Sequence, residues 1–507
     1  MKKVKIITSL VVGLTMAFAF TGCGQQEEAG DSGSTGEAKT LHVAADGNDE
    51  TGDGSEDAPF ATVGGAIASG IGPGSAIYVH EGTYDPIEIT SEASGTNEDP
   101  VLIAAAEKDA EYEHVVIKGK KSKVQNGEED FEASVGIHMV NVDGIVIRGF
   151  EVSGGTHGIL YESTKEQGDT VLENISIEDC NIHDIVGTHG IAFYAGNDFA
   201  PVKAVSITNC EVRDCLCGDS ESMVLNGNID SFVIAGNVIH DNNTIGIDMI
   251  GFEGTAKHDK DSDFENRYDA DFVRNGECHD NIVYNISAMD NPAYYEDGNY
   301  DLCADGIYVD GGQDIEIYNN FVFNCDIGLE VATEHSPDDN ELFKVSGIKV
   351  HDNVVADCKG WCGLCFGGYD RDLGFTENCE FNNNTFVDNE TQVGVQRSKD
   401  NVIRDNLFVG EDNSTIEFNY DCKEKDLVNE FEANVWCIGE GSLEDYMDTG
   451  DYDTAVMMPN GGMEKQVVMH NKDEAIDGFA SLVEGVGSEF VPGEQAMELY
   501  DGNKEAY

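Results

Sequence analysis

A corner motif of the form apolar-x-x-Asn-x-apolar recurs through most of this 507-residue chain and limits what it can fold into. Its central position passes through Phe150, Cys180, Cys210, Asn237, Asn281, Asn320, Asn353, Asn384 and Asn406. The spacing between these positions varies from 22 to 44 residues, which is typical of a solenoid whose additional length lies in loops. Around the corners, apolar residues alternate with period two, which indicates strands rather than helices. The motif predicts an all-β solenoid.

The asparagine column has a predicted structural role. Coils of strands stack about 4.8 Å apart in parallel sheets, so the five asparagines from Asn281 to Asn406 would lie one above another. We expect an inward ladder in which each side-chain amide bonds the next, because buried polar groups at a corner need partners. The alternative is a set of turn asparagines exposed to water. Cys180 and Cys210 in the same column are expected to be small buried filler.

The first residues predict export. A basic start and an apolar run from Ile6 to Phe20 precede Phe20-Thr21-Gly22-Cys23. This arrangement resembles a bacterial lipoprotein signal, although Phe20 stands where that family usually has Leu. The resemblance implies a signal peptide over 1–23, acylation of Cys23, and a membrane-anchored lipoprotein at the bacterial cell surface. Residues 24–40 are rich in Gly, Ser and Glu and predict a flexible linker; ordinary secretion is the alternative.

The segment that follows carries a family resemblance. It contains a predicted strand at 41–43, an acidic loop, a short predicted helix at 63–69 and a predicted strand at 76–80. Together with the repeats this segment resembles the pectate-lyase-like right-handed parallel β-helix superfamily, over about 41–418. The resemblance implies a β-helix over 41–420 with an N-terminal capping helix. Residues 421–507 lose the repeat, and we expect them to form an irregular, acidic C-terminal cap.

The charge of the chain limits its partners. There are 98 acidic against 29 basic residues, a formal net charge of −69. Nucleic acid binding needs cationic surfaces, so nucleic acid is excluded as a partner. An anionic polysaccharide would need a divalent cation or a basic cluster between it and the protein.

Strand alternation predicts a candidate site on one face of the solenoid. If Ile247, Ile307 and Leu329 point inward, the residues after them point outward. These are Asp248, Tyr308 and Glu330, with Asp310 diagonal to Glu330. The two longest repeats flank this face, and long loops on a rigid scaffold often carry function. The full acidic set is Asp248, Asp305, Asp310, Glu330 and Glu334.

This acidic set has three interpretations. Asp248, Asp305, Asp310 and Glu330 could hold calcium, which takes six to eight oxygen ligands. Asp310 and Glu330 could instead serve as the acid and base of a glycosidase. The third interpretation is a solvated acidic face of an acidic protein.

Further candidates surround the acids. Arg274 re-enters the coil after the longest loop and is the favoured catalytic base, although it could equally be paired to loop acids. Glu334 and His335 end the Glu330 strand and are candidates for proton transfer. The predicted substrate-binding residues are Tyr308, Tyr369 and Asp370.

Thirteen cysteines remain besides Cys23. Cys358, Cys362, Cys365 and Cys379 lack the paired C-x2-C hairpins of a zinc knuckle. Stacking would place Cys325 beneath Cys358. We expect a disulfide or buried thiols rather than zinc.

The resemblance and the site predict an enzyme that acts on carbohydrate. The leading hypothesis is a monomeric, calcium-dependent polysaccharide lyase that cleaves an acidic, uronate-containing polysaccharide by β-elimination. The alternatives are a glycoside hydrolase that uses Asp310 and Glu330, and a carbohydrate-binding or adhesive protein without catalysis. The chain departs from the lyase pattern because no Asp-Asp-Gly string lies on the predicted strands and no Lys faces the acids.

Overall fold

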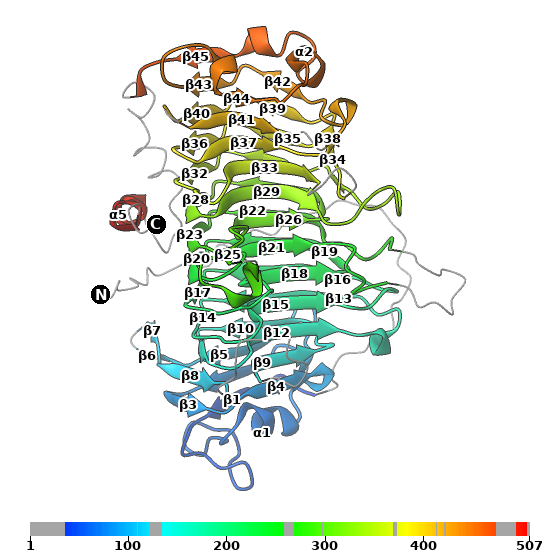
Figure 1. The fold of residues 1–507 in the computed structure, drawn as a ribbon. Helices are drawn as coiled ribbons and strands as arrows, with labels where there is room; N and C mark the ends of the chain where they lie inside the picture. The colour runs from blue at the N-terminus through cyan, green and yellow to red at the C-terminus, as the bar shows by residue number, and fades with distance from the viewer. Residues whose placement is uncertain are drawn as a thin grey trace.

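The chain forms a right-handed parallel β-helix whose three long sheets share one core (Figure 1). This computed structural model describes residues 36–108, 110–120, 134–257, 268–296, 298–368, 373–411, 413–419, 422–472 and 493–503. The predicted signal peptide and its lipidation site, Cys23, lie outside these residues, as does most of the predicted linker. Within the described ranges, no helix has the length and apolarity needed to cross a membrane.

Each coil contributes one strand to each sheet. The first sheet contains β1 (Thr40–Val43), β2 (Ala76–Val79), β5 (Val101–Ala105), β10 (Ile145–Arg148), β13 (Leu172–Glu178), β16 (Val202–Thr208), β19 (Ile229–Ala235), β22 (Arg274–His279), β27 (Gln313–Tyr318), β31 (Lys349–His351), β35 (Glu380–Asn382), β39 (Val402–Arg404) and β42 (Glu430–Glu432). Three short strands extend it, namely β30 (Val345–Ser346), β34 (Thr376–Glu377) and β38 (Ser398–Lys399).

The second sheet follows the first in every coil. It contains β3 (Gly82–Tyr84), β8 (Val115–Lys118), β11 (Glu151–Ser153), β14 (Asn181–His183), β17 (Glu211–Arg213), β20 (Val238–Asn242), β23 (Ile282–Ile286), β28 (Phe321–Cys325), β32 (Val354–Ala356), β36 (Thr385–Val387), β40 (Leu407–Val409), β43 (Val435–Cys437) and β45 (Val467–Met469).

The third sheet completes each coil. It contains β4 (Ile87–Thr90), β9 (Val135–Val140), β12 (His157–Ser163), β15 (His189–Ala195), β18 (Met223–Gly227), β21 (Ile247–Ile250), β26 (Asp305–Asp310), β29 (Ile327–Thr333), β33 (Cys362–Gly368), β37 (Thr391–Val395), β41 (Ser414–Phe418) and β44 (Met447–Asp448). Two small antiparallel hairpins lie outside the sheets: β6 (Glu107–Lys108) with β7 (Glu111–Tyr112), and β24 (Tyr295–Glu296) with β25 (Asn299–Tyr300).

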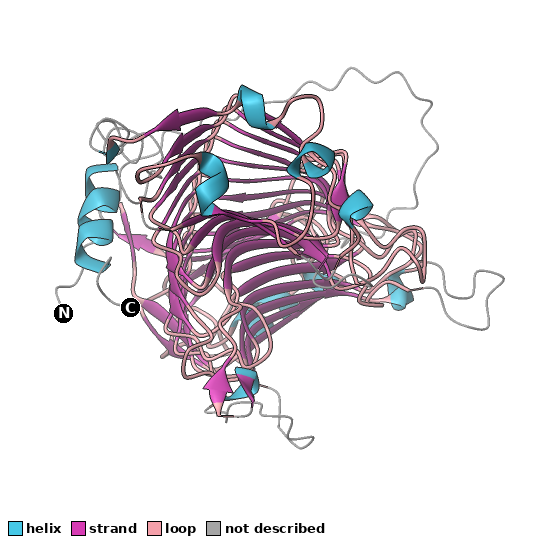
Figure 2. Cartoon of the chain, turned by 45° about the horizontal axis from the view of Figure 1, so that its top comes forward, coloured by secondary structure: helices cyan, strands magenta, loops and turns pink. Residues whose placement is uncertain are grey.

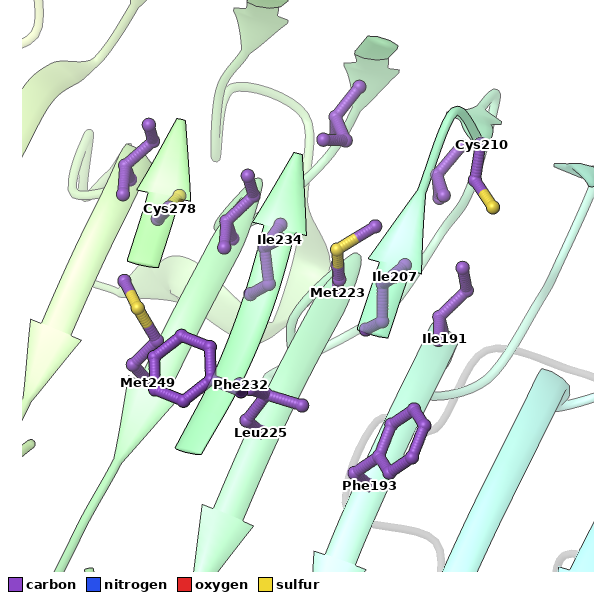
Figure 3. Packing of buried hydrophobic residues seen from close by; sticks show 14 of the residues in the cluster. Ile191, Phe193, Ile207, Cys210, Met223, Leu225, Phe232, Ile234, Met249 and Cys278 are labelled. Atoms are coloured by element: carbon purple, nitrogen blue, oxygen red, sulfur yellow. The ribbon is translucent and has the colours of Figure 1, made fainter. Parts of the chain in front are cut away.

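Alternate side chains of the three sheets fill a continuous core. Inward residues of neighbouring coils stack on one another, as Figure 3 shows for Phe193, Leu225 and Met249 of the third sheet and for Ile207, Ile234 and Cys278 of the first. Ile247, Ile307 and Leu329 belong to this core, at 0%, 0% and 1% exposure. The predicted inward phase of the third sheet is therefore confirmed.

The corner between the first and second sheets contains the predicted asparagine ladder. Asn320 shows the pattern, because its backbone N–H and its side-chain amide both donate to Oδ1 of Asn353, at 3.0 and 2.9 Å. The preceding residue, Asn319, has φ of 58°, a left-handed conformation that Asn and Asp tolerate better than most residues. The ladder begins earlier and ends later than predicted, running from Asn237 to Asn434. Cys180 and Cys210 are buried at its beginning, as expected.

The cysteines of the described residues are free thiols. Cys325 is the last residue of β28 and is in register with Cys358, which lies two residues after β32, since Phe323 pairs with Ala356. The predicted stacking of these two cysteines is confirmed, with buried thiols as the observed state.

The N-terminal end of the core is closed by the predicted helix, α1 (Val63–Ala68). Its N-cap Thr62 accepts a hydrogen bond from Gly65 N, and Asp49 accepts from the backbone N–H groups of Ala61 and Thr62. Val63, Ala66 and Ile67 face the core. The acidic loop thus holds the cap in place.

The C-terminal boundary predicted at residue 420 is too early. β42, β43 and β44 add another coil to all three sheets. This coil keeps the inward residues Phe431 and Trp436 and the ladder residue Asn434, so the repeat persists with its corner motif intact. Beyond it, α2 (Thr454–Met457) covers the last coil and buries Met457 and Met458.

One helix lies on the side of the solenoid. Figure 2 shows helices at the periphery of the stacked strands, and α5 (Gly493–Asn503) packs on the outward face of the second sheet. Tyr500 contacts Phe321 and Phe323 and donates a hydrogen bond of 2.5 Å to Asp357. The C-terminal segment therefore does two things: α2 caps the last coil, and α5, which we call the strap, covers part of the outward face of the second sheet.

Candidate functional site

Acidic side chains gather on the outward face of the third sheet, where β21, β26 and β29 lie side by side. Asp248 pairs with Tyr308, and Tyr308 pairs with Glu330. Asp310 pairs with Ala332, two residues beyond Glu330. These pairings confirm the predicted register, and they place acids of three coils on one face.

Asp305 and Glu330 form the centre of this acidic cluster. Burial raises the pKa of Asp305 well above its usual value, and the charge and hydrogen bond of Glu330 raise it further. Burial also raises the pKa of Glu330 to about 7, although its hydrogen bonds with Asp305 and Cys365 act in the opposite direction. These raised pKa values favour a protonated form of the pair, because two adjacent anions would repel.

Two carboxyl oxygens of the cluster lack partners. Oδ1 of Asp248 and Oδ1 of Asp305 are buried and have no hydrogen-bond partner among the described residues. Both side chains are 2% exposed. Burial is the largest cause that raises the pKa of Asp248 well above its usual value, and the charges of Glu221 and Asp310 raise it further. Unpaired buried oxygens are costly, so this face is suited to a ligand that brings donors or a cation.

Asp310 lies among charges of both signs. Its Oδ1 accepts a hydrogen bond of 3.2 Å from the backbone N–H of Glu334. Burial raises its pKa, and the charges of Glu334 and Glu253 raise it further, whereas the Glu334 N–H and the charge of His335 lower it. Asp310 is therefore the carboxyl of the set that has both a donor and a cation beside it.

His335 is held by an acid outside the predicted set. Its Nε2 lies 2.9 Å from Oε1 of Glu253, and its ring packs against Phe343. The hydrogen bond that the ring donates to Glu253 is the largest cause that raises the pKa of His335. The structure thus brings Glu334 and His335 to the acidic cluster and favours the protonated form of His335.

Four residues of this face were missed at the sequence level: Glu221, Glu253, His189 and Tyr194. Glu221 and Glu253 stand in the loops that precede β18 and follow β21, where strand alternation does not apply. Burial raises the pKa of Glu221 to about 8.

His189 and Tyr194 form a buried pair beside these acids. His189 Nε2 lies 2.8 Å from the Tyr194 hydroxyl, and Nδ1 lies 3.0 Å from the carbonyl oxygen of Glu221. Burial lowers the pKa of His189 to about 3, so the ring is neutral. Nδ1–H donates to the carbonyl, and Nε2 accepts from Tyr194. The spacing of His189 gave no signal of this role.

Tyr308 and Arg274 have different positions relative to the cluster. Tyr308 lies between Asp248 and Glu330 but is only 7% exposed. Arg274 donates hydrogen bonds of 3.0 Å to the carbonyl oxygen of Phe272 and to Oδ1 of Asn228, and its guanidinium lies over the Phe272 ring. The structure therefore gives Arg274 contacts outside the acidic cluster, and the role of catalytic base stays a prediction. Tyr369 and Asp370 lie outside the described residues.

The two long loops meet the third sheet at opposite ends of its strands: one begins at the C-terminal end of β21, and the other ends at the N-terminal end of β26. One follows β21, where Asp271 accepts hydrogen bonds from the backbone of Gly254 and Ala256. The other joins β23 to β26, and its Asn291 side chain donates to the carbonyl oxygens of Gly218 and Asn243. Both loops are thus anchored beside the acidic cluster, as their lengths predicted.

Calcium at this face stays a prediction. The described residues contain no group of three or more His, Cys, Asp or Glu side chains arranged to hold a metal ion. The free oxygens of Asp248 and Asp305 are nevertheless of the type that calcium binds. What the structure brings together is the carboxyls of Asp305 and Glu330 on neighbouring strands, both with raised pKa values, and Asp310 on the same strand as Asp305.

Comparison with known proteins supports the fold. Residues 265–447 match the family model described as periplasmic copper-binding protein (NosD). The GH136 lacto-N-biosidase from Eubacterium ramulus is 13% identical, with a TM-score of 0.51 over 86% of this chain and 67% of that chain. A mannuronic acid-specific family 6 polysaccharide lyase from the human gut microbiota is 13% identical, with a TM-score of 0.49 over 92% of this chain and 100% of that chain.

A full-length relative is more similar in sequence. YwoF, an uncharacterized protein of Bacillus subtilis (strain 168), is 32% identical over 446 residues, which are 83% of this chain and 86% of that protein. The alignment spans most of both chains. The chain therefore belongs to the YwoF family, and its fold is the pectate-lyase-like right-handed parallel β-helix.

Proposed function

We propose that the protein is an extracytoplasmic carbohydrate-active enzyme that hydrolyses glycosidic bonds of a neutral glycan. Glu330 is the general acid, and Asp310 is the general base or nucleophile. The observation that carries the proposal is the pair of carboxyls, Asp305 and Glu330, on the neighbouring strands β26 and β29 of the third sheet, both with raised pKa values. The periplasmic name of the matched family model supports the location.

The Asp305–Glu330 pair supplies a proton at neutral pH. A general acid works best when its pKa lies near the working pH, and burial raises the pKa of Glu330 to about 7. Glu330 is partly exposed, whereas Asp305 is 2% exposed. Glu330 is therefore the member that reaches the leaving oxygen of a glycosidic bond, and Asp305 holds it in place.

Asp310 is the second carboxyl of the proposed pair. Burial and the charges of Glu334 and Glu253 raise its pKa well above its usual value, and the N–H of Glu334 and the positive charge of His335 are the contacts that act in the opposite direction and support its charged form. Glycosidases use two carboxyls, one protonated and one ionised. Asp310 stands on the strand next to Glu330, so the two can act on opposite sides of one bond.

The charge of the site favours a neutral glycan. A uronate polymer would approach a protein with a net charge of −69, and like charges repel. The free oxygens of Asp248 and Asp305 need donors, and sugar hydroxyls are donors. The GH136 lacto-N-biosidase has a similar fold, and the proposal is compatible with this architecture.

Calcium-dependent β-elimination of an acidic polysaccharide is the second candidate. One observation favours it: the unpaired oxygens of Asp248 and Asp305 could bind a calcium ion that bridges a uronate to the protein. β-Elimination also needs a base to remove a proton from the uronate, and the predicted base, Arg274, instead donates its hydrogen bonds to Asn228 and the Phe272 carbonyl oxygen.

The test compares products from neutral and uronate polymers. Wild-type protein should release reducing ends from at least one neutral polysaccharide, without the ultraviolet absorbance of an unsaturated uronate and without sensitivity to a chelator. Glu330→Gln and Asp310→Asn should each lower the rate by about 10²- to 10⁴-fold. Glu88→Gln is the matched control, because Glu88 is exposed in the same outward row of the third sheet.

Three outcomes separate the candidates. Chelator-sensitive absorbance from a uronate polymer would replace hydrolysis by β-elimination. Glycan binding without products would indicate a non-catalytic carbohydrate-binding protein. Equal activity of the Glu330→Gln and Glu88→Gln variants would contradict the assigned general acid.

A further inference from the structure

We propose that Trp361 and Gln396 form a sugar-binding subsite beside Glu330, which takes a neutral pyranose residue through its apolar face. This inference rests on the proposed function and extends it, because it identifies where the glycan continues beyond the bond that is cleaved. The subsite lies on the outward face of the third sheet, on the C-terminal side of Glu330.

Trp361 lies on that face at the start of β33. Its indole is partly exposed and packs against Ile327, Cys362 and Cys365. The indole Nε1 donates a hydrogen bond of 3.2 Å to Oε2 of Glu417. A ring that is fixed at its polar edge and packed on one side is pre-organised for stacking.

The floor beneath the indole is made of small residues. In the outward row, Glu330 is followed by Cys365, Gly394 and Glu417 on the next three strands. A Cβ atom on Gly394 would meet Cζ2 and Cη2 of Trp361 at 3.0 and 3.3 Å. The indole therefore lies directly on Gly394, where a larger side chain would move it.

Gln396 provides an independent sign of a ligand. Val393 and Val395 point inward at 0% exposure, so Gly394 and Gln396 point outward. Gln396 is 6% exposed, and its Oε1 has no hydrogen-bond partner among the described residues. An unpaired buried oxygen costs about 1–3 kcal/mol, and a sugar hydroxyl or amide could satisfy it.

The subsite is continuous with the acidic cluster. Cys365 bonds Glu330 and also packs against Trp361. Two strand spacings, about 10 Å, separate Glu330 from Gly394. A glycan that lies across the strands would therefore place one residue on Trp361 when its glycosidic bond reaches Glu330.

The chemistry of the subsite selects the sugar. An indole face attracts the C–H face of a pyranose, and few polar groups fix its orientation. The neighbouring carboxylate of Glu417 accepts donors and repels a uronate. The expected occupant is a neutral hexose or pentose residue with one unsubstituted face.

Tryptophan fluorescence tests the subsite without catalysis. The chain has two tryptophans, and Trp436 is 0% exposed in the core. The Glu330→Gln variant is titrated with cellohexaose, xylohexaose, a β-1,4-linked galactohexaose and hexagalacturonate. At least one neutral oligosaccharide should change the tryptophan emission, whereas hexagalacturonate should not. No change with any of the three neutral probes would overturn the subsite.

Matched variants locate the effect. In the Glu330→Gln background, Trp361→Ala and Gln396→Ala should weaken calorimetric binding of the responding probe at least about tenfold, and Trp361→Phe should weaken it less. Tyr78→Ala removes a partly exposed aromatic residue from the first sheet and should leave binding unchanged. Equal affinity of the Trp361→Ala and Tyr78→Ala variants would contradict the proposal, provided thermal unfolding shows both folded.

Kinetics separate this inference from the proposed function. With an active Glu330, Trp361→Ala should raise KM more than it lowers kcat. If the probe binds at Trp361 but the wild type releases no product, the proposed function fails and the subsite stands. If products form with an unchanged KM in Trp361→Ala, the subsite fails and hydrolysis stands.

Discussion

Asn320 shows how single side chains join the coils of this solenoid. Its Oδ1 accepts hydrogen bonds from the backbone and side chain of Asn281, and its amide donates to Asn353. The same amide also reaches the carbonyl oxygens of Cys278 and Tyr318. One residue therefore satisfies groups from three coils, and its role was predictable because its neighbours in the column are also Asn.

Asn320→Ala should lower the free energy of unfolding by at least about 3 kcal/mol, because it leaves buried groups of Asn281 and Asn353 without partners. Chemical denaturation of the full chain measures the change. Asn382→Ala removes a partly exposed asparagine of the first sheet and is the control. A difference between the two variants of less than about 1 kcal/mol would show that the ladder does not bear on stability.

Other residues of the site could be predicted only in part. Asp248, Asp310 and Glu330 follow from strand alternation once the register is known. Glu221 and Glu253 reach the same face from loops, whose course does not follow the period of the strands. For Arg274 the sequence indicated a position at the end of the longest loop but not its contacts, since its guanidinium bonds to Asn228 and to the Phe272 carbonyl.

At the scale of elements, α5 shows a contact that the repeat could not reveal. Phe321, Phe323 and Tyr284 form an apolar patch on the outward face of the second sheet. The helix covers this patch with Ala496 and Tyr500, which are 0% and 8% exposed. Outward residues of a solenoid are usually polar, so these aromatic residues indicated a cover without showing which segment supplies it.

Tyr500→Ala should loosen this strap. The variant loses the ring contacts with Phe321 and Phe323 and the hydrogen bond to Asp357. Truncating a large buried aromatic residue typically costs about 3–5 kcal/mol. We expect faster proteolysis near α5 and increased binding of a hydrophobic dye, with the main unfolding transition retained. Tyr500→Phe loses only the hydrogen bond and should therefore change the rate of proteolysis and the binding of the dye less than Tyr500→Ala does. Resistance of Tyr500→Ala to proteolysis equal to that of wild type would contradict the account of α5.

At the scale of the whole molecule, the fold was predictable because one register is repeated in every coil. The inward phase of Ile307 and the column at Asn320 each fix the position of a strand relative to its neighbours. The boundary at residue 420 was wrong because one more coil follows it, with the corner motif intact in Phe431, Asn434 and Trp436 and with Asn434 28 residues after Asn406. The acidic composition after residue 420 therefore did not mark the end of the repeat.

The net negative charge of the whole molecule does not by itself identify the site. The net charge of −69 is spread over the chain, whereas the buried acids of the third sheet have raised pKa values. Raised pKa values are typical of functional sites. Burial, rather than the number of acids, is therefore what marks Asp305 and Glu330.

The dependence of kcat/KM on pH is the most direct test of whether protonated Glu330 is the general acid. Glu330 must be protonated to act, and its pKa is raised to about 7. The measurement uses a neutral polysaccharide that the wild type cleaves. For the wild type, kcat/KM should decrease as the pH rises through about 7. The residual activity of Glu330→Gln should not show this decrease. A rate that stays constant between about pH 5 and pH 9, or the same decrease in Glu330→Gln, would contradict the claim that Glu330 is the general acid.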